Sequence, residues 1–230
     1  MYSPKTLGDV VFHDAETKEL VLKHAKPNNF RNLLLYGPPG TGKTTVANLI
    51  ATTIYPPQPT QSELLKINGS MNRSIDDVRK NIEPKCRVNV LRSPHLFIVI
   101  INEAERMTAE AQDALRDVME GKNEETVKFI LTTNYLDKIE KPIQSRCQKV
   151  AMYAADAETW EKPLENLLQQ LGLDGDEELP NSVTQHLGKD NRQLIEELED
   201  WVEDVKLELE TLNVVEIPSK SKKKGKLNDK

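Results

Sequence analysis

The sequence has few cysteines, few histidines and no long apolar run. Two cysteines, Cys86 and Cys147, and four histidines occur among 230 residues. This content predicts neither a disulfide framework nor a metal framework. It indicates a reducing intracellular compartment, which could be the cytoplasm, the nucleus or the nucleoid. The longest apolar run, LFIVII at 96–101, is too short to cross a bilayer, and the N-terminus lacks the pattern of a signal peptide, so no membrane association is expected.

The chain also lacks an excess of positive charge. Its net charge is −6, with 30% charged and 37% hydrophobic residues, which is typical of a polar globular protein and argues against a generally basic nucleic-acid binder. The charge is segregated, because residues 196–210 are acidic whereas 219–230, SKSKKKGKLNDK, are rich in lysine. No repeat of solenoid period occurs.

Apolar segments alternate with helical periodicity over the first two thirds of the chain. Strands are expected at 32–36, 64–68, 96–101, 127–133 and 148–153, with helices at 46–54, about 75–82 and 108–120. This alternation predicts an α/β fold, a parallel sheet flanked by helices on both faces. Ligands of such sheets bind at the carboxyl ends of the strands.

From about residue 156 the strand signal stops. Helices are predicted at 159–172, 179–188 and 190–212, the last amphipathic through Leu194, Leu198, Trp201, Val205 and Leu209. We therefore expect a nucleotide-binding domain at 1–154, a small all-helical lid domain at 155–213 and a lysine-rich disordered tail at 214–230.

The segment GPPGTGKT between the first strand and its helix matches the phosphate-binding loop pattern. Its glycines allow successive backbone N–H groups to surround a phosphate, Lys43 can reach the β- and γ-phosphates, and the Thr44 hydroxyl can bind Mg²⁺. A chance glycine-rich turn is the alternative. The sequence thus predicts ATP and Mg²⁺ as cofactors, bound by Gly37, Pro38, Pro39, Gly40, Thr41, Gly42, Lys43, Thr44 and Thr45.

Polar side chains follow the third and fourth strands. Glu103 is expected to orient the attacking water and Asn134 to hydrogen-bond that water or the γ-phosphate, although Glu103 also fits a plain solvated carboxylate. The residue before Glu103 is Asn102, where such ATPases usually have Asp. Its amide can accept a hydrogen bond near the metal but brings no charge, so hydrolysis is expected to be slow, or the site binds ATP without turnover.

Arg146 lies in KPIQSRCQKV, on a segment expected to be a loop at the edge of the nucleotide face. A guanidinium suits phosphate oxygens. Because it lies too far from its own chain's nucleotide, we predict that Arg146 reaches the γ-phosphate bound by an adjacent subunit. An ordinary surface salt bridge is the alternative.

These motifs, in the order GPPGTGKT, KINGSMNRSIDDVRKNI, IINEAERMTAEAQDALRDVME and FILTTNYLDKIEKPIQSRC, resemble those of the AAA+ ATPases and, within them, the small subunits of sliding-clamp loaders of the replication factor C type. The resemblance is dense over about residues 2–150. It implies that Arg146, within SRC, acts in trans. It also implies that SPKTLGDVV, with Val10 and Val11, borders the adenine pocket, and that Arg192 in GKDNRQL senses the γ-phosphate. A surface arginine at a helix start is the alternative for Arg192.

The resemblance further implies contacts to primer–template DNA from residues after the second and third strands, which would position the duplex without reading its sequence. Each residue taken singly also fits a solvated surface group. The matching positions are Arg73, Ser74, Ile75, Arg79, Arg106 and Thr108.

The primary functional hypothesis is therefore an ATP-dependent subunit of a DNA sliding-clamp loader, with other AAA+ subunits, a sliding clamp and primer–template DNA as partners. Clamp-loader subunits carry a third, helical collar domain, and this sequence ends after the expected lid. Two alternatives stay open: an ATP-binding structural subunit with little hydrolysis, favoured by Asn102, and a helicase loader or other DNA-remodelling ATPase.

Overall fold

A five-stranded parallel sheet forms the centre of the computed structural model, which describes residues 4–55, 59–60, 63–92, 96–121, 125–171 and 179–215. The strand order is β2-β3-β4-β1-β5, so each strand pairs in parallel with its neighbour. The strands are β1 (Leu33–Tyr36), β2 (Leu64–Asn68), β3 (Phe97–Asn102), β4 (Val127–Thr133) and β5 (Gln148–Ala151). The predicted parallel α/β fold is confirmed.

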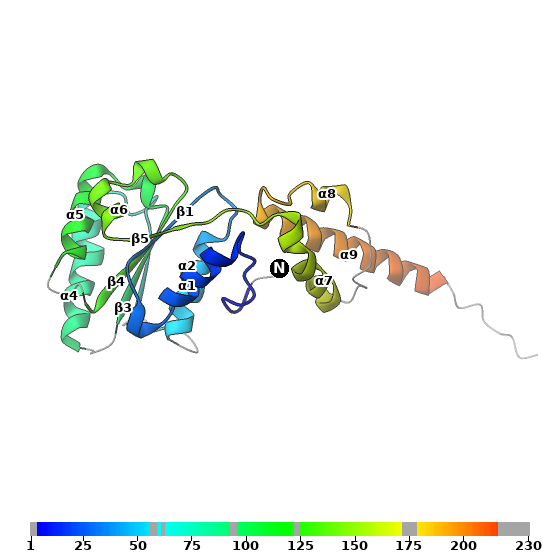
Figure 1. The fold of residues 1–230 in the computed structure, drawn as a ribbon, viewed down its shortest axis with the longest axis horizontal. Helices are drawn as coiled ribbons and strands as arrows, with labels where there is room; N and C mark the ends of the chain where they lie inside the picture. Colours follow the sequence, from blue (N-terminus) through cyan, green and yellow to red (C-terminus); the bar gives the residue numbers. More distant parts are fainter. Residues whose placement is uncertain are drawn as a thin grey trace, which may run out of the picture.

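Helices cover both faces of this sheet (Figure 1). On one face lie α1 (Ala15–His24) and α2 (Lys43–Ile54). On the other lie α4 (Glu83–Arg92), α5 (Ala109–Met119) and α6 (Lys141–Ser145). Strand β3 explains why both layers are needed: Phe97, Val99 and Ile101 pack into the core under α5, whereas Ile98 and Ile100 pack into the core under α2. Burial of both faces produces the continuous apolar run seen in the sequence.

Several helix starts are fixed by polar caps. Asp14 accepts a hydrogen bond from the backbone N–H of Thr17 at 2.6 Å at the start of α1, a helix that the sequence did not lead us to predict. Thr108 caps α5 by accepting from the N–H of Ala111 at 3.2 Å. The predicted start of this helix is confirmed.

One local prediction was wrong, and one helix was predicted too short. The segment 141–147, expected as a loop, begins with the helix α6, in which Pro142 occupies the first turn, where its missing N–H has no helical partner to lose. The helix expected at 75–82 is only the start of a longer helical stretch: α3 (Ile75–Asp77), a π-helical turn η2 (Val78–Ile82) and α4 follow one another. Val78 and Ile82 are buried against the sheet in this stretch.

The helical region comprises α7 (Ala157–Leu171), α8 (Asn181–Thr184) and α9 (Asn191–Val215). It has an apolar core of its own, to which Trp160, Leu194 and Leu198 contribute. Helix α8 is shorter than the helix expected at 179–188. The amphipathic character of α9 is confirmed at Leu194, Leu198, Trp201 and Val205. The tail expected at 214–230 was placed two residues too early, because α9 extends to Val215; the side chain of Leu209 and residues 216–230 lie outside the described residues.

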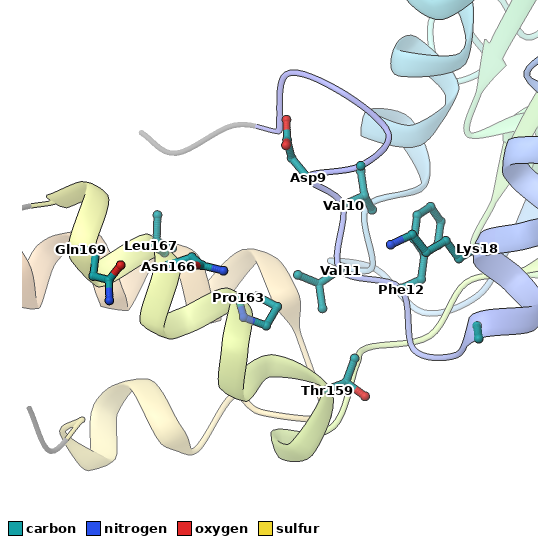
Figure 2. Close-up of a pocket in the computed structure, with 12 residues that line it drawn as sticks. Asp9, Val10, Val11, Phe12, Lys18, Thr159, Pro163, Asn166, Leu167 and Gln169 are labelled. Carbon is teal, nitrogen blue, oxygen red and sulfur yellow. The ribbon is translucent and has the colours of Figure 1, made fainter. Parts of the chain in front are cut away.

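The N-terminal segment joins the two parts of the chain. Leu7 and Phe12 are buried in the core of the sheet and α2, while Val11 packs against the core of the helical region. Figure 2 shows residues 9–12 passing between α7 and the sheet-covering helices. Among the described helices, none combines the length and apolar character needed to cross a membrane.

Candidate nucleotide-binding site

The glycine-rich loop connects β1 to α2 in a conformation that requires glycine. Gly37, Gly40 and Gly42 have φ values of 146°, 78° and 84°. These values lie in the region that side chains disfavour. A Cβ on Gly37 would also lie 1.9 Å from the backbone oxygen of Met152, after β5. The loop therefore depends on glycine both for its backbone conformation and for its close approach to the neighbouring strand.

Lys43, the first residue of α2, points its side chain back into this loop. Its Nζ donates hydrogen bonds to the carbonyl oxygen of Gly37 at 2.8 Å and to that of Pro38. Burial lowers the pKa of Lys43 from 10.5 to about 8; the nearby charge of Glu105 partly opposes this shift, and that of Arg192 adds to it. Neutral carbonyls contact this desolvated ammonium, and an anion bound beside it would favour its charged form.

A cavity of about 190 Å³ opens beside this lysine at the carboxyl ends of β3 and β4. It brings together Lys43, Thr44, Glu103, Asn134 and Arg192, five residues from four separate segments that the sequence predicted to form one site. The full lining comprises Pro39, Gly40, Gly42, Lys43, Thr44, Thr45, Glu103, Glu105, Thr132, Thr133, Asn134 and Arg192.

Asn102 and Glu103 are engaged within the protein at the end of β3. The Thr132 hydroxyl donates to Oδ1 of Asn102 at 3.2 Å and lies 3.3 Å from the backbone N–H of Glu103, which donates to it. Glu103 has a φ of 53°, unusual for a residue with a side chain. Its carboxylate forms an ion pair with Nε of Arg106 at 3.2 Å. Glu103 would have to leave Arg106 to orient a water at a bound phosphate.

Glu105 is a cavity residue that the sequence analysis missed. It lies in the 3₁₀ turn η3 (Ala104–Arg106), and its Oε1 accepts a hydrogen bond from the backbone N–H of Asn134 at 3.1 Å. The signal that could have found it is the pattern E-A-E after the third strand: two residues beyond Glu103, a second carboxylate remains within reach of the same sheet edge.

A second cavity, of about 240 Å³, lies on the other side of the glycine-rich loop, between the loop, the N-terminal segment and the helical region. Val10, Val11 and Arg192, predicted to contact nucleotide, line it. The remaining lining residues are Pro4, Asp9, Gly40, Thr41, Gly42, Thr45, Trp160, Asn191, Ile195 and Glu196. An apolar pocket that borders a phosphate-binding loop suits a purine base.

The start of α9 contacts the glycine-rich loop directly. The backbone N–H of Arg192 lies 3.2 Å from the carbonyl oxygen of Gly40 and 2.9 Å from Oδ1 of Asp190. A Cβ on Gly40 would lie 1.9 Å from Oδ1 of Asp190, so a side chain there would displace the carboxylate that accepts from the N–H groups of Arg192 and Gln193. This contact holds Arg192 at the edge of both cavities.

A larger cavity, of about 680 Å³, lies between the N-terminal segment, α1 and α7 (Figure 2). Val10 and Val11 line it from one side, and Pro163 and Leu167 of α7 line it from the other. No described residue of the glycine-rich loop lines this cavity, so its size does not make it the nucleotide site.

Arg146 lies apart from these cavities. It follows α6, before the edge strand β5, and it is not among the described residues that line them. Its guanidinium forms an ion pair with Glu120 at the end of α5 and donates to the carbonyl oxygen of Pro142 at 2.6 Å. The side chain remains 35% exposed, so it can be reached by another molecule.

Two buried amides fix the segment that carries Arg146. The Gln112 side chain accepts from the N–H of Glu140 at 2.9 Å and donates to the carbonyl of Lys138 at 3.1 Å. The Gln144 side chain donates to the carbonyl of Ile139 at 2.7 Å. Buried polar side chains with satisfied hydrogen bonds define one conformation of the backbone around them.

The residues expected to contact DNA lie in two segments, one after β2 and one after β3, that a hydrogen bond joins. The backbone N–H of Thr108, at the start of α5, donates to the carbonyl of Arg73 at 2.9 Å, just before α3. Ser74 forms a capping box with Asp77, which uses the N–H groups of both residues. The partly buried Ile75 and the exposed Arg79 lie beyond this cap, and Arg106 is engaged by Glu103.

Residues 33–153 match the family of ATPases associated with various cellular activities, AAA, which spans more than half of the chain. The chain therefore belongs to this ATPase family, and membership implies nucleotide binding.

Within this family the chain is similar to replication factor C subunits. It is 40% identical over 146 residues to the small subunit of Methanocella arvoryzae, covering 64% of this chain and 44% of that protein. It is 41% identical over 152 residues to the small subunit of Saccharolobus solfataricus, covering 66% and 45%. Replication factor C subunit 2 of Schizosaccharomyces pombe is 32% identical over 201 residues, covering 85% and 58%. The chain thus spans about half the length of these relatives.

Solved structures show the same fold at low sequence identity. The Holliday junction branch migration motor RuvB of Thermotoga maritima superposes with a TM-score of 0.64 at 18% identity, covering 91% of this chain and 67% of that one. Domain III of the replication initiation protein DnaA of Thermotoga maritima superposes with a TM-score of 0.61 at 15% identity, covering 93% and 92%. These likenesses support the fold alone.

Proposed function

We propose that this chain is an ATP-hydrolysing subunit of a DNA sliding-clamp loader. ATP and Mg²⁺ occupy the cavity at Lys43 and Thr44, neighbouring AAA+ subunits assemble around it, and the assembly binds a sliding clamp and primer–template DNA. ATP binding orders the subunits for clamp opening and DNA capture, and hydrolysis releases the clamp. The similarity to replication factor C subunits supports this assignment.

One observation carries the proposal of catalysis between subunits. The cavity contains the phosphate-binding loop, Glu103 and Asn134, whereas Arg146 lies outside it on a rigidly held, exposed segment. A phosphoryl-transfer site gains about 10³- to 10⁵-fold in rate from an arginine that meets the γ-phosphate. Arg146 has the charge and exposure to provide this contact to a neighbouring subunit.

The proposed DNA contacts are supported by the joined segments at Arg73 and Thr108. Helix starts leave backbone N–H groups that suit phosphate oxygens, and the exposed Arg73 and Arg79 add positive charge there. Asp76 and Asp77 lie in the same turn. Binding should therefore be weak and salt-dependent for the single chain and become strong when several subunits line one channel.

The test is ATP turnover by the reconstituted assembly. We expect primed DNA together with the clamp to stimulate hydrolysis, and Lys43→Ala and Arg146→Ala each to abolish the stimulated rate. Stimulation by a helicase, with no response to any clamp, would instead assign the chain to a helicase loader. If Arg146→Ala leaves hydrolysis intact while Lys43→Ala removes it, the role of Arg146 in trans is wrong.

A second candidate is a nucleotide-bound structural subunit with little hydrolysis. The hydrogen bond from Thr132 to the neutral amide of Asn102 favours it, because this position provides no anionic ligand. Intact ATP retained for hours in the complete assembly with DNA and clamp would support this candidate, and rapid turnover would exclude it.

A further inference from the structure

Glu105 carries a buried oxygen that nothing in the described protein binds. Its Oε1 accepts from the N–H of Asn134 at 3.1 Å, but its Oε2 is buried without a hydrogen-bond partner among the described residues. Burial of a carboxylate oxygen without a partner is costly unless a ligand satisfies it. This oxygen belongs to a residue that lines the phosphate-side cavity together with Lys43 and Thr44.

The two polar side chains at the end of β3 already have partners. The Asn102 amide oxygen accepts from Thr132 at 3.2 Å, and the Glu103 carboxylate pairs with Arg106 at 3.2 Å. Lys43 donates to loop carbonyls and not to Glu105, although the charge of Glu105 acts on its ammonium. Glu105, a residue that lines the cavity, thus has one oxygen held by a backbone N–H and one buried oxygen without a partner among the described residues.

The cavity fits Mg²⁺ only if an anionic oxygen is supplied. Mg²⁺ bound with ATP phosphates uses hydroxyl, water and one or two carboxylate oxygens as its protein ligands. Thr44 provides a hydroxyl, and Asn102 is neutral. The carboxylate of Glu103, which also lines the cavity, is paired with Arg106 and is assigned to the attacking water. Resting on the proposed binding of ATP in this cavity, we propose that Glu105 supplies the carboxylate oxygen for the ATP-bound Mg²⁺, a role that the amide of Asn102 does not fill.

The test measures how strongly Mg²⁺ tightens nucleotide binding by the single chain. The dissociation constant of a fluorescent ATP analogue is determined in excess MgCl₂ and in excess EDTA, and the ratio gives the gain due to the metal. Glu105→Gln keeps an oxygen for the N–H of Asn134 but loses the charge. We expect Glu105→Gln to reduce the metal-dependent gain in affinity about tenfold, the size of effect seen when residues around a metal site are changed. The affinity measured in EDTA should not change.

Two further variants keep the test sharp. Adding Asn102→Asp to Glu105→Gln returns a carboxylate to the strand end and should restore most of the gain. The matched change Glu19→Gln, at an exposed position of α1, should leave the gain at the wild-type value. Glu105→Asp, which keeps the charge on a shorter side chain, should retain part of the gain. Thermal unfolding of each variant verifies that it is folded.

A wild-type gain in Glu105→Gln would overturn the proposal. Equal weakening in MgCl₂ and EDTA would also overturn it, because Glu105 would then act through Asn134 alone. Absence of any gain in the wild-type chain has the same consequence. Because neither clamp nor DNA is present, these results do not depend on the clamp-loader assignment.

Discussion

Two of the cationic groups proposed to meet phosphates, Lys43 and Arg146, occupy opposite environments. Lys43 is 7% exposed and lies within its own chain's glycine-rich loop, which holds it through backbone carbonyls. Arg146 is 35% exposed at its side chain and is held by an ion pair with Glu120 at the edge of the sheet. A buried cation can contact only a nucleotide bound by its own chain, whereas an exposed cation on a fixed segment can contact a nucleotide bound by a neighbouring chain. We therefore expect nucleotide binding to be complete in one chain and hydrolysis to need a second.

The largest expected effect separates these two functions. Arg146→Ala should lower ATP turnover of the assembly about 10³- to 10⁵-fold, because it removes the transition-state contact. Nucleotide affinity of the single chain should not change, since Arg146 does not line the cavities of the described residues. Steady-state phosphate release and titration with a fluorescent ATP analogue measure the two quantities.

The matched control for this change is Arg31→Ala. Arg31 is also exposed but precedes β1, at the opposite end of the strands from the glycine-rich loop, so its removal should leave turnover unchanged. A parallel loss of affinity and turnover in Arg146→Ala would place this residue in its own chain's site.

The pKa of Lys43 predicts how nucleotide binding depends on pH. Because this pKa is lowered to about 8, the ammonium loses its proton in the free chain above pH 8, and nucleotide affinity should fall by up to about tenfold per pH unit. The stability of the chain without nucleotide should change in the opposite direction. Between pH 8 and 10.5 the unfolded state binds more protons than the folded state, so the free energy of unfolding should rise with pH in this range.

Titrations with the fluorescent analogue from pH 7 to 10, and urea unfolding over the same range, measure both trends. Lys43→Met removes the titrating group and should flatten both. Unchanged slopes in that variant would assign the pH dependence to another residue.

The contact between the glycine-rich loop and α9 should respond to Gly40→Ala. The new methyl group would collide with Asp190 and would sit at a φ of 78°, which together should open the contact at a cost of about 1–2 kcal/mol or more. We expect roughly tenfold weaker nucleotide binding and faster hydrogen exchange at the N–H of Arg192. That N–H now lies against the carbonyl of Gly40.

Gly42→Ala is the matched control, because Gly42 has a similar φ of 84° but no atom within 4 Å of an added Cβ. Both variants carry the backbone strain, and only Gly40→Ala carries the collision. Equal exchange at Arg192 in the two variants would show that the collision does not open this contact.

The smallest expected effect concerns the ion pair that holds Arg146. Arg146 must leave Glu120 to reach a neighbour's phosphate, so Glu120→Gln should raise turnover of the assembly. A partly exposed ion pair contributes about 0–1 kcal/mol, which limits the increase to about fivefold. In the double variant with Arg146→Ala, Glu120→Gln should have no effect, and an increase there would contradict the explanation.

The sequence predicted the sheet and the phosphate-binding loop because both depend on local signals. The apolar strands alternate with helices, and the glycines and Lys43 are contiguous, so no distant contact is needed to interpret them. Helix α6 was missed because its five residues begin with a proline-containing segment and are too short for helical periodicity to show. The buried amides of Gln112 and Gln144, which determine this segment, became apparent only from its tertiary contacts.

Glu105 illustrates what single-residue motifs leave out. The family pattern drew attention to Asn102 and Glu103, but the ion pair of Glu103 with Arg106 and the turn η3 decide which carboxylate keeps an oxygen without a partner among the described residues. Neither the ion pair nor the unpartnered oxygen can be derived from spacing, because both depend on the side-chain conformations at the ends of two neighbouring strands.

The most direct test of the central claim is ATP turnover per chain as a function of protein concentration, with the state of association followed by sedimentation in the same buffer. We predict that the monomer binds nucleotide but turns it over at least about 10³-fold more slowly than the assembly, with the rate rising as neighbours associate. A strictly monomeric chain that hydrolyses ATP at the full rate of the assembly, unchanged by dilution, would contradict this prediction.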